Sequence, residues 1–280
     1  MTDASPLSRL RAALAGRYTL ERELGRGGMA TVWLARDLKH DRLVALKVLR
    51  PEIAQALGTE RFLQEIELTT RLHHPRLIPL LESGEAAGQL FYVMPCVSGE
   101  SLRDRLRRQT QLSLADALRL TREVAEALSY AHGEGVVHRD VKPENVMLAD
   151  DHAVVTDFGL AKALTEAGGK KLTDTGITVG TPAYMSPEQG AGSRQLDARS
   201  DLYSLATVLY EMLAGDPPFS GVNGQAILAR KAADPVPRLR TVRPDVPPPL
   251  EQVIDRALAR APADRFATVA EFAAALAVAG

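Results

Sequence analysis

Residues 138–145 read His-Arg-Asp-Val-Lys-Pro-Glu-Asn, and residues 157–159 read Asp-Phe-Gly. These polar segments stand beside short apolar runs that we expect to be strands: GVV at 135–137, NVMLA at 145–149 and AVVTD at 153–157. Packing does not explain two carboxylates and an amide in loops between apolar strands, because such side chains are rarely buried without a partner. The sequence therefore predicts a chemical site here.

The residue types in these two segments are those that phosphoryl transfer from ATP requires. Asp140 offers a carboxylate that can orient an acceptor hydroxyl or take its proton. Asn145 and Asp157 offer the oxygen ligands that Mg²⁺ prefers, and Lys142 can neutralise charge on the transferred group. We therefore expect ATP and Mg²⁺ as cofactors.

A glycine-rich loop lies upstream, where residues 25–32 read GRGGMATV. A Rossmann dinucleotide site needs a strand before its glycines and a helix after them. Here the loop joins two predicted strands, residues 18–24 and 30–36, so the Rossmann interpretation fails. The loop either just closes a hairpin or lies over a triphosphate, to which glycines offer backbone N–H groups without side-chain obstruction.

Lys47 lies in a third predicted strand, residues 43–49. Such a lysine can simply extend its apolar stem along the sheet. If Lys47 faces the glycine loop, it can bind the α- and β-phosphates, provided that a carboxylate holds it. Glu65, on a helix predicted for residues 58–72, is the best candidate. Glu67 is the rival, and it lies about 200° around the helix from Glu65, so only one of them faces the strands.

The overall composition is that of an ordinary folded protein: 280 residues, 45% of them hydrophobic, with 34 Lys+Arg and 35 Asp+Glu for a net charge of −1. This balance gives no support for nucleic-acid binding. The single cysteine, Cys96, cannot form an internal disulfide, which favours a reducing compartment. No apolar run is long enough to span a membrane, and the first residues lack a secretory signal. We expect a cytoplasmic chain, and the sequence leaves open a membrane anchor beyond Gly280.

The order of predicted elements divides the chain into two parts. Residues 18–97 are mainly extended, with a fourth strand at residues 89–94, and residues 98–278 are mainly helical. The predicted helices of the second part cover residues 113–132, 201–214, 225–233, 249–260 and 269–278. Ser113 and Thr268, each with an acidic residue three positions later, are the predicted N-caps of the first and the last of them. We therefore expect an α+β chain with a small antiparallel sheet lobe, a larger helical lobe, a hinge near residues 95–97, and an N-terminal extension over residues 1–17.

Taken together, these motifs resemble the bacterial, eukaryotic-like (Hanks-type) serine/threonine protein kinases over residues 18–278. The glycine loop, VALK, the helix glutamate, HRDVKPEN, DFG and a Ser-Pro-Glu segment at 186–188 follow in the family's order. The resemblance implies a bilobal protein-kinase fold and transfer of the ATP γ-phosphate to Ser/Thr hydroxyls of proteins. Mg²⁺, or Mn²⁺ in its place, would accompany ATP. The Ser/Thr preference is implied by Lys142 and by Gly180-Thr181.

The resemblance also assigns roles to single residues. It implies that Glu188 pairs with Arg265, that Asp201 anchors the Arg139-Asp140 turn, and that Thr181 positions Lys142 and Asp140. The catalytic set is Asp140, Lys142, Lys47 and Glu65, with Asn145 and Asp157 on the metal. The ATP-binding set is Leu24, Gly25, Arg26, Gly27, Gly28, Val32, Ala45, Lys47, Met94, Pro95 and Val97.

The hinge departs from the family pattern, because a proline follows Met94 where an acidic residue is usual. Proline lacks an N–H but keeps its carbonyl. The Pro95 carbonyl can therefore accept from the adenine amino group while the Val97 N–H donates back. Cys96 then lies at the adenine rim, as a small packed side chain rather than a reactive thiol.

Residues 163–185, between DFG and Ser-Pro-Glu, are rich in Gly, Lys and Thr. Thr173 and Thr175 match positions that similar bacterial kinases autophosphorylate, with Thr178 a weaker third candidate. A phosphate there could bind the Arg139 guanidinium and order the segment. The partners implied are protein substrates and the kinase itself, and the sequence leaves open a homodimer through the small lobe.

Two other functions remain compatible with parts of the pattern. A pseudokinase scaffold would bind nucleotide without transferring phosphate, although Lys47, Asp140, Asn145 and Asp157 show no degeneration. A small-molecule phosphotransferase of related fold would share the region around Asp140. It would lack the long loop that ends in Ser-Pro-Glu, which favours a protein substrate.

Overall fold

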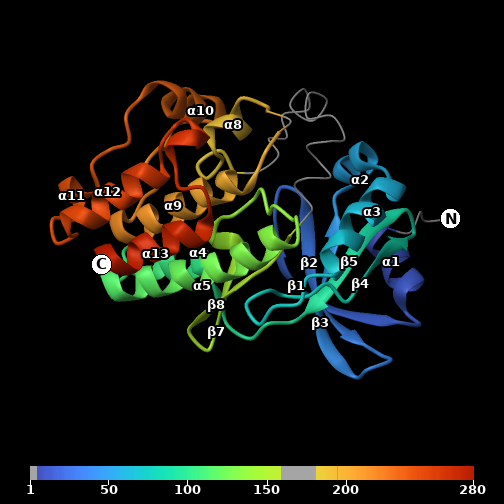
Figure 1. The fold of residues 1–280 in the computed structure, drawn as a ribbon. Helices are drawn as coiled ribbons and strands as arrows, with labels where there is room; N and C mark the ends of the chain where they lie inside the picture. The colour runs from blue at the N-terminus through green and yellow to red at the C-terminus, as the bar shows by residue number, and fades with distance from the viewer. Residues whose placement is uncertain (1–4, 159–180, 194) are drawn as a thin grey trace.

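The computed structural model describes residues 5–158, 181–193 and 195–280, except for the side chains of Glu65 and Leu68. The described chain forms a sheet lobe followed by a helical lobe, coloured from blue to teal and from green to red in Figure 1. The predicted α+β bilobal architecture is therefore confirmed. The domain boundaries at residues 17 and 278 stay predictions.

The sheet of the first lobe is antiparallel throughout and has the strand order β1-β2-β3-β5-β4. The predicted strands are present, and a short strand that the pattern did not predict joins β5. That strand reads Glu-Ser-Gly-Glu-Ala and has none of the β-branched or aromatic residues that favour strands; pairing with β5 decides its conformation. The strands are β1 (Tyr18–Arg26), β2 (Ala30–Asp37), β3 (Arg42–Leu49), β4 (Glu82–Ala86) and β5 (Gln89–Pro95).

Helix α3 (Thr59–Thr70) is the helix predicted for this lobe, with Phe62, Ile66 and Thr69 buried as its spacing requires. Two helices were not predicted, α1 (Pro6–Leu14) and α2 (Pro51–Leu57). Helix α1 lies within the predicted N-terminal extension. Leu10 and Leu14 of α1 are buried against the sheet, so this part of the extension packs as part of the lobe.

The second lobe is built around α9 (Ala198–Ala214), which is buried along nearly its whole length. Helices α5 (Leu114–Gly133) and α13 (Val269–Ala279) pack against α9. The predicted caps are present: Ser113 and Thr268 each accept a backbone N–H from the residue three positions later. The other helices are α4 (Leu102–Gln109), α8 (Pro187–Gly190), α10 (Gly224–Ala233), α11 (Leu239–Val242) and α12 (Pro248–Ala257).

A small three-stranded sheet of this lobe carries two of the predicted polar loops. Its order is β6 (Glu100–Ser101), β7 (Val146–Ala149) and β8 (His152–Val155). The strand predicted at residues 135–137 is absent, so that prediction was wrong. The places beside β7 and β8 are already taken, by β6 and by a bridge from Leu77 to Val155, which leaves no partner edge for these residues there.

Candidate active site

The predicted site residues of the two lobes meet where β3 faces the segment after β8. The Lys47 Nζ atom lies 2.7 Å from Asp157 Oδ2, although 110 positions separate the two residues in sequence. Both side chains are largely buried. Burial by itself raises the pKa of Asp157, but the charge and hydrogen bond of Lys47, together with a hydrogen bond from Tyr92, outweigh it and leave this pKa lowered. Asp157 is therefore held as a carboxylate.

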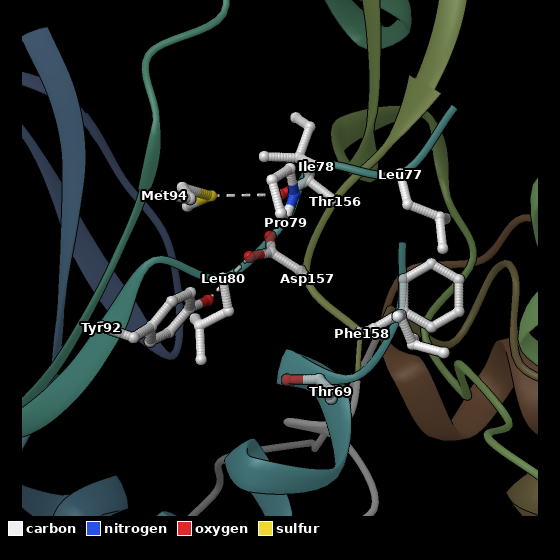
Figure 2. Close-up of a pocket in the computed structure, with 11 residues that line it drawn as sticks. Thr69, Leu77, Ile78, Pro79, Leu80, Tyr92, Met94, Thr156, Asp157 and Phe158 are labelled. Carbon is white, nitrogen blue, oxygen red and sulfur yellow. Dashed lines mark hydrogen bonds between the residues drawn. The ribbon is translucent and has the colours of Figure 1, made fainter. Parts of the chain in front are cut away.

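Tyr92 on β5 is a site residue that the sequence did not predict. Its hydroxyl donates a 2.7 Å hydrogen bond to Asp157 Oδ1 (Figure 2). Lys47 Nζ lies 5.7 Å from the centroid of the Tyr92 ring. The Tyr92 side chain is buried, and this burial raises its pKa well above the ordinary value. The sequence offered only its place in the strand, two residues before Met94 and so on the same face. Its partner Asp157 lies 65 positions away, which no local pattern indicates.

The loop before β7 brings two of the predicted polar side chains, Lys142 and Asn145, to the carboxylate of a third, Asp140. Lys142 Nζ lies 2.6 Å from Asp140 Oδ2, and Asn145 Nδ2 donates to the carbonyl and to Oδ2 of Asp140, at 2.8 and 3.1 Å. Within the described residues, Asp140 Oδ1 has no hydrogen-bond partner. One oxygen of Asp140 is thus oriented by its neighbours, while the other is available to an incoming hydroxyl.

Asp201, a fully buried residue in the first turn of α9, anchors the turn that carries Asp140. Its carboxylate accepts from the backbone N–H groups of His138 and Arg139, at 2.8 and 2.7 Å, and contacts His132 Nε2 at 2.8 Å. Burial raises the pKa of Asp201, but these hydrogen bonds and nearby imidazoles outweigh it, and the pKa is lowered. Arg139 has a φ of 67°, a strained value for a residue with a side chain. The buried carboxylate therefore holds an uncommon backbone turn.

His138 links this turn to the strand before Asp157. Its Nδ1 accepts from the Asp140 N–H at 3.2 Å, so Nε2 carries the proton that is donated to the Thr156 carbonyl at 2.9 Å. Phe158 lies against the His138 ring, with centroids 4.3 Å apart. The two polar segments are thus joined through one imidazole.

Glu188 and Arg265 form a bidentate ion pair at 2.8 and 2.7 Å. Arg265 is fully buried, and its other N–H groups donate to backbone carbonyls. Next to Glu188, Gln189 Nε2 donates to the Arg139 carbonyl at 2.8 Å. Helix α8 is therefore held by two contacts: the ion pair of its Glu188 with Arg265, and the hydrogen bond of its Gln189 with the turn beside Asp140.

The glycine loop joins β1 and β2, as predicted, and residues 25–28 are exposed. A Cβ atom on Gly25 or Gly28 would meet nothing within 4 Å, so the space around this loop is open. Behind it, Ala45 on β3 pairs with Met94 on β5, and Met94 Sδ accepts from the Thr156 hydroxyl at 3.3 Å (Figure 2). The remaining ATP-binding candidates lie on or next to these strands: Leu24, Arg26, Gly27, Val32, Pro95 and Val97.

Several residues that the sequence analysis named lie outside the described part of the chain, wholly or with their side chain. Glu65 lies on α3, and its side chain is outside the described part, as are Gly159, Thr173, Thr175 and Thr178. Thr181 is described, and its carbonyl accepts from the Tyr184 N–H at 2.9 Å. Cys96 is a free, partly buried cysteine.

The oxygen donors of the site are suitable for Mg²⁺. The described residues contain no group of three His, Cys, Asp or Glu side chains that could hold a metal by themselves. Mg²⁺ in nucleotide sites instead takes one or two protein oxygens and completes its shell with phosphates and water. Asn145 uses its Nδ2 for Asp140, which leaves the amide oxygen for a ligand, and Asp157 is a carboxylate. These two residues therefore fit a metal that arrives with a nucleotide.

A family model and curated relatives each match nearly the whole chain. The family model described as "Protein kinase domain" matches residues 18–275. Serine/threonine-protein kinase PknD of Mycobacterium tuberculosis (strain H37Rv) is 41% identical over 261 residues, which are 92% of this chain and 39% of PknD. Serine/threonine-protein kinase PknB of Mycolicibacterium smegmatis is 42% identical over 268 residues, 93% of this chain and 42% of PknB. The chain thus spans less than half the length of these two relatives.

A solved structure, a cysteine-to-alanine variant of the PknI kinase domain of Mycobacterium tuberculosis, superposes with a TM-score of 0.74 at 34% identity. The match covers 93% of this chain and 94% of that one. The similarity therefore extends through both lobes. In the described part of the chain, no helix combines the length and apolar character needed to cross a membrane.

Proposed function

Since this chain belongs to the protein kinase domain family, we propose that it is a serine/threonine protein kinase that transfers the γ-phosphate of ATP to protein hydroxyls. The observation that carries the proposal is the convergence of Lys47 with Asp157 and of Lys142 and Asn145 with Asp140. A scaffold that only binds nucleotide has no need of an oriented carboxylate with one free oxygen.

In this mechanism Asp140 receives the acceptor hydroxyl. Its Oδ2 is held by Lys142 and Asn145, so the free Oδ1 accepts the hydroxyl proton or orients it for in-line attack. Lys142 stabilises negative charge close to the acceptor. Because Asp201 fixes the backbone of the turn, the carboxylate is positioned before the acceptor arrives.

Asn145 and Asp157 would hold Mg²⁺, which together with ATP supplies the phosphoryl group and neutralises its charge. Lys47 would orient the α- and β-phosphates, with Glu65 as its carboxylate partner on α3. The open glycine loop would cover the triphosphate, and the Pro95 carbonyl and Val97 N–H would bind adenine. The names of the relatives support a Ser/Thr acceptor. We also propose a cytoplasmic location, where ATP is available.

The substitution Asp140→Asn tests the catalytic proposal. We expect label transfer from ATP to a generic basic protein to fall by about 100-fold or more, because an amide cannot take the proton. The Kd for Mg-ATP should change by less than about twofold. Asp216→Asn, at an exposed aspartate, is the matched control and should behave as the wild type.

Other results of the transfer assay would favour a different role for Asp140 or a different function. Equal transfer by Asp140→Asn would remove Asp140 from the catalytic role. A wild-type protein that binds Mg-ATP but labels no protein would favour the scaffold, and phosphorylation of small alcohols alone would favour a small-molecule phosphotransferase.

We further propose that phosphorylation of Thr173 and Thr175 activates the enzyme. The support is Arg139, whose Nε atom is buried and has no hydrogen-bond partner among the described residues. A phosphate would bring acceptor oxygens and negative charge to that guanidinium. Intact mass after incubation with Mg-ATP should show added phosphates, and Thr173→Ala/Thr175→Ala should remove them and lower activity. No mass gain, or full activity of the double variant, would contradict the proposal.

A further inference from the structure

Lys231, on α10, is buried in the helical lobe with 1% of its surface exposed. Lysine is almost never buried to this degree unless it is paired. Burial lowers the pKa of Lys231 to about 7, and the charge of Glu188 opposes this shift only in part. Lys231 forms no ion pair among the described residues. Its position therefore has a cost in solvation that its other contacts must offset.

Those contacts are with the segment that precedes α8. The Lys231 Nζ atom donates to the carbonyls of Ala183 and Met185, both at 2.6 Å. It also lies 5.1 Å from the centroid of the Tyr203 ring on α9, within the range of a cation–π contact. Its three donors are thus directed to two carbonyls and an aromatic face.

The intervening carbonyl is held as well. Ser204 on α9 donates from its hydroxyl to the Tyr184 carbonyl at 2.8 Å. Three successive carbonyls, at residues 183, 184 and 185, therefore bind side chains of α9 and α10 rather than strand or helix partners. Backbone groups need such partners when they are not in regular structure. The shape of this segment is therefore set by side chains, and Lys231 supplies two of the three bonds.

This segment lies beside the acceptor side of the site. It continues directly into α8, and Gln189 of α8 donates to the carbonyl of Arg139, the residue before Asp140. Gln189 follows Met185 by four residues, so α8 links the backbone of residues 183–185 to the turn that carries Asp140.

We propose that Lys231 is a positioning residue for the acceptor protein. It holds the backbone of residues 183–185 in the shape against which the acceptor chain docks, and so it sets the affinity for the acceptor and not the affinity for ATP. The inference rests on the proposed kinase function. Lys231 is remote in sequence from the motifs that bind ATP, and it acts through the carbonyls of Ala183 and Met185.

The substitution Lys231→Met tests this role, because methionine keeps the apolar stem and removes the donors and the charge. The acceptor is a synthetic Ser/Thr peptide, chosen from an arrayed set by its phosphorylation with the wild type. We expect the KM for this peptide to rise about tenfold, from the loss of two hydrogen bonds to buried carbonyls. The KM for ATP and the rate of ATP hydrolysis without peptide should stay within about twofold of the wild type.

Arg230→Met is the matched control, since Arg230 is the adjacent cation on α10 and is exposed, with bonds to Asp234 and the Ser220 carbonyl. It should leave the KM for the peptide unchanged. Lys231→Gln, which keeps two N–H donors, should give an intermediate KM. All variants are compared at the same phosphorylation state, measured by intact mass.

An unchanged KM for the peptide in Lys231→Met would overturn the inference, as would an equal loss of ATP hydrolysis without peptide. Should Lys231→Met fail to fold, Lys231→Gln is tested for the same separation of the two KM values. Failure of both variants to fold would also overturn the proposal, because Lys231 would then be a general stabilising residue. If the wild type hydrolyses no ATP and labels no peptide, the kinase proposal fails first.

Discussion

Tyr92 shows how one side chain outside the sequence motifs can shape the site. Its hydroxyl occupies one oxygen of Asp157 while Lys47 occupies the other. An aromatic residue in a strand is usually explained by packing, and most of the Tyr92 ring does pack in the sheet lobe. The hydroxyl adds a hydrogen bond to a charged acceptor, which is stronger than one to a neutral group.

Tyr92→Phe should therefore lower the free energy of unfolding by about 2 kcal/mol, because a buried carboxylate loses a donor. Tyr210→Phe is the comparison, since Tyr210 donates to a neutral acceptor, the Pro237 carbonyl, at 3.2 Å. Its cost should be about 1 kcal/mol or less. Both values come from denaturant unfolding with an unchanged m-value. Equal costs for the two variants would contradict the special role of the Asp157 acceptor.

At the scale of elements, α9 holds the backbone of the turn that carries Asp140. The helix is buried, and the carboxylate of its Asp201 replaces the hydrogen bonds that the backbone of His138 and Arg139 lacks in this turn. Ser204 of the same helix holds the Tyr184 carbonyl. One helix thus orients both the catalytic turn and the segment before α8.

The lowered pKa of Asp201 gives a pH dependence of stability with a definite sign. The unfolded chain takes up a proton near the ordinary aspartate pKa, about 3.9, whereas folded Asp201 stays ionised to lower pH. The stabilisation is therefore complete above about pH 5 and falls as the pH drops through the folded-state value. Glu188, whose pKa is also lowered against the effect of its burial, mainly by Arg265, adds a loss of the same sign.

Asp201→Asn should lower the free energy of unfolding at pH 7 by about 3 kcal/mol, because buried N–H groups lose a charged acceptor. It should also flatten the decline in stability as the pH falls below about 5, where the unfolded chain begins to take up the proton. Denaturant unfolding at a series of pH values measures both effects. Asp216→Asn should keep the wild-type slope, and a slope in Asp201→Asn as steep as in the wild type would show that other groups cause the decline.

At the scale of the whole molecule, the two lobes have separate hydrophobic cores. The polar residues of the site lie where the lobes meet, and the Lys47–Asp157 pair connects one lobe to the other. Phosphoryl transfer requires protein side chains on both sides of a nucleotide. At a boundary between two hydrophobic cores, such polar side chains do not have to be buried in either core. Each lobe is therefore stabilised by its own hydrophobic core, and no apolar side chains have to occupy the site.

The sequence by itself determined the features that depend on neighbours along the chain. Short runs rich in β-branched and aromatic residues predicted β1, β2, β3 and β5, the caps at Ser113 and Thr268 marked two helices, and the polar loop segments identified Asp140, Asn145 and Asp157. These signals are local, because strand period, capping geometry and loop chemistry are decided within a few residues.

Only the tertiary structure decided the features that depend on distant partners. β4 forms because β5 offers an edge, the segment at residues 135–137 has none, and α1 joins the sheet lobe through two leucines. Tyr92 and Lys231 became functional candidates only when Asp157 and the carbonyls of Ala183 and Met185 were found at their ends. A hydrogen bond between residues far apart leaves no period or motif in the sequence, because its energy depends on where folding brings the two groups.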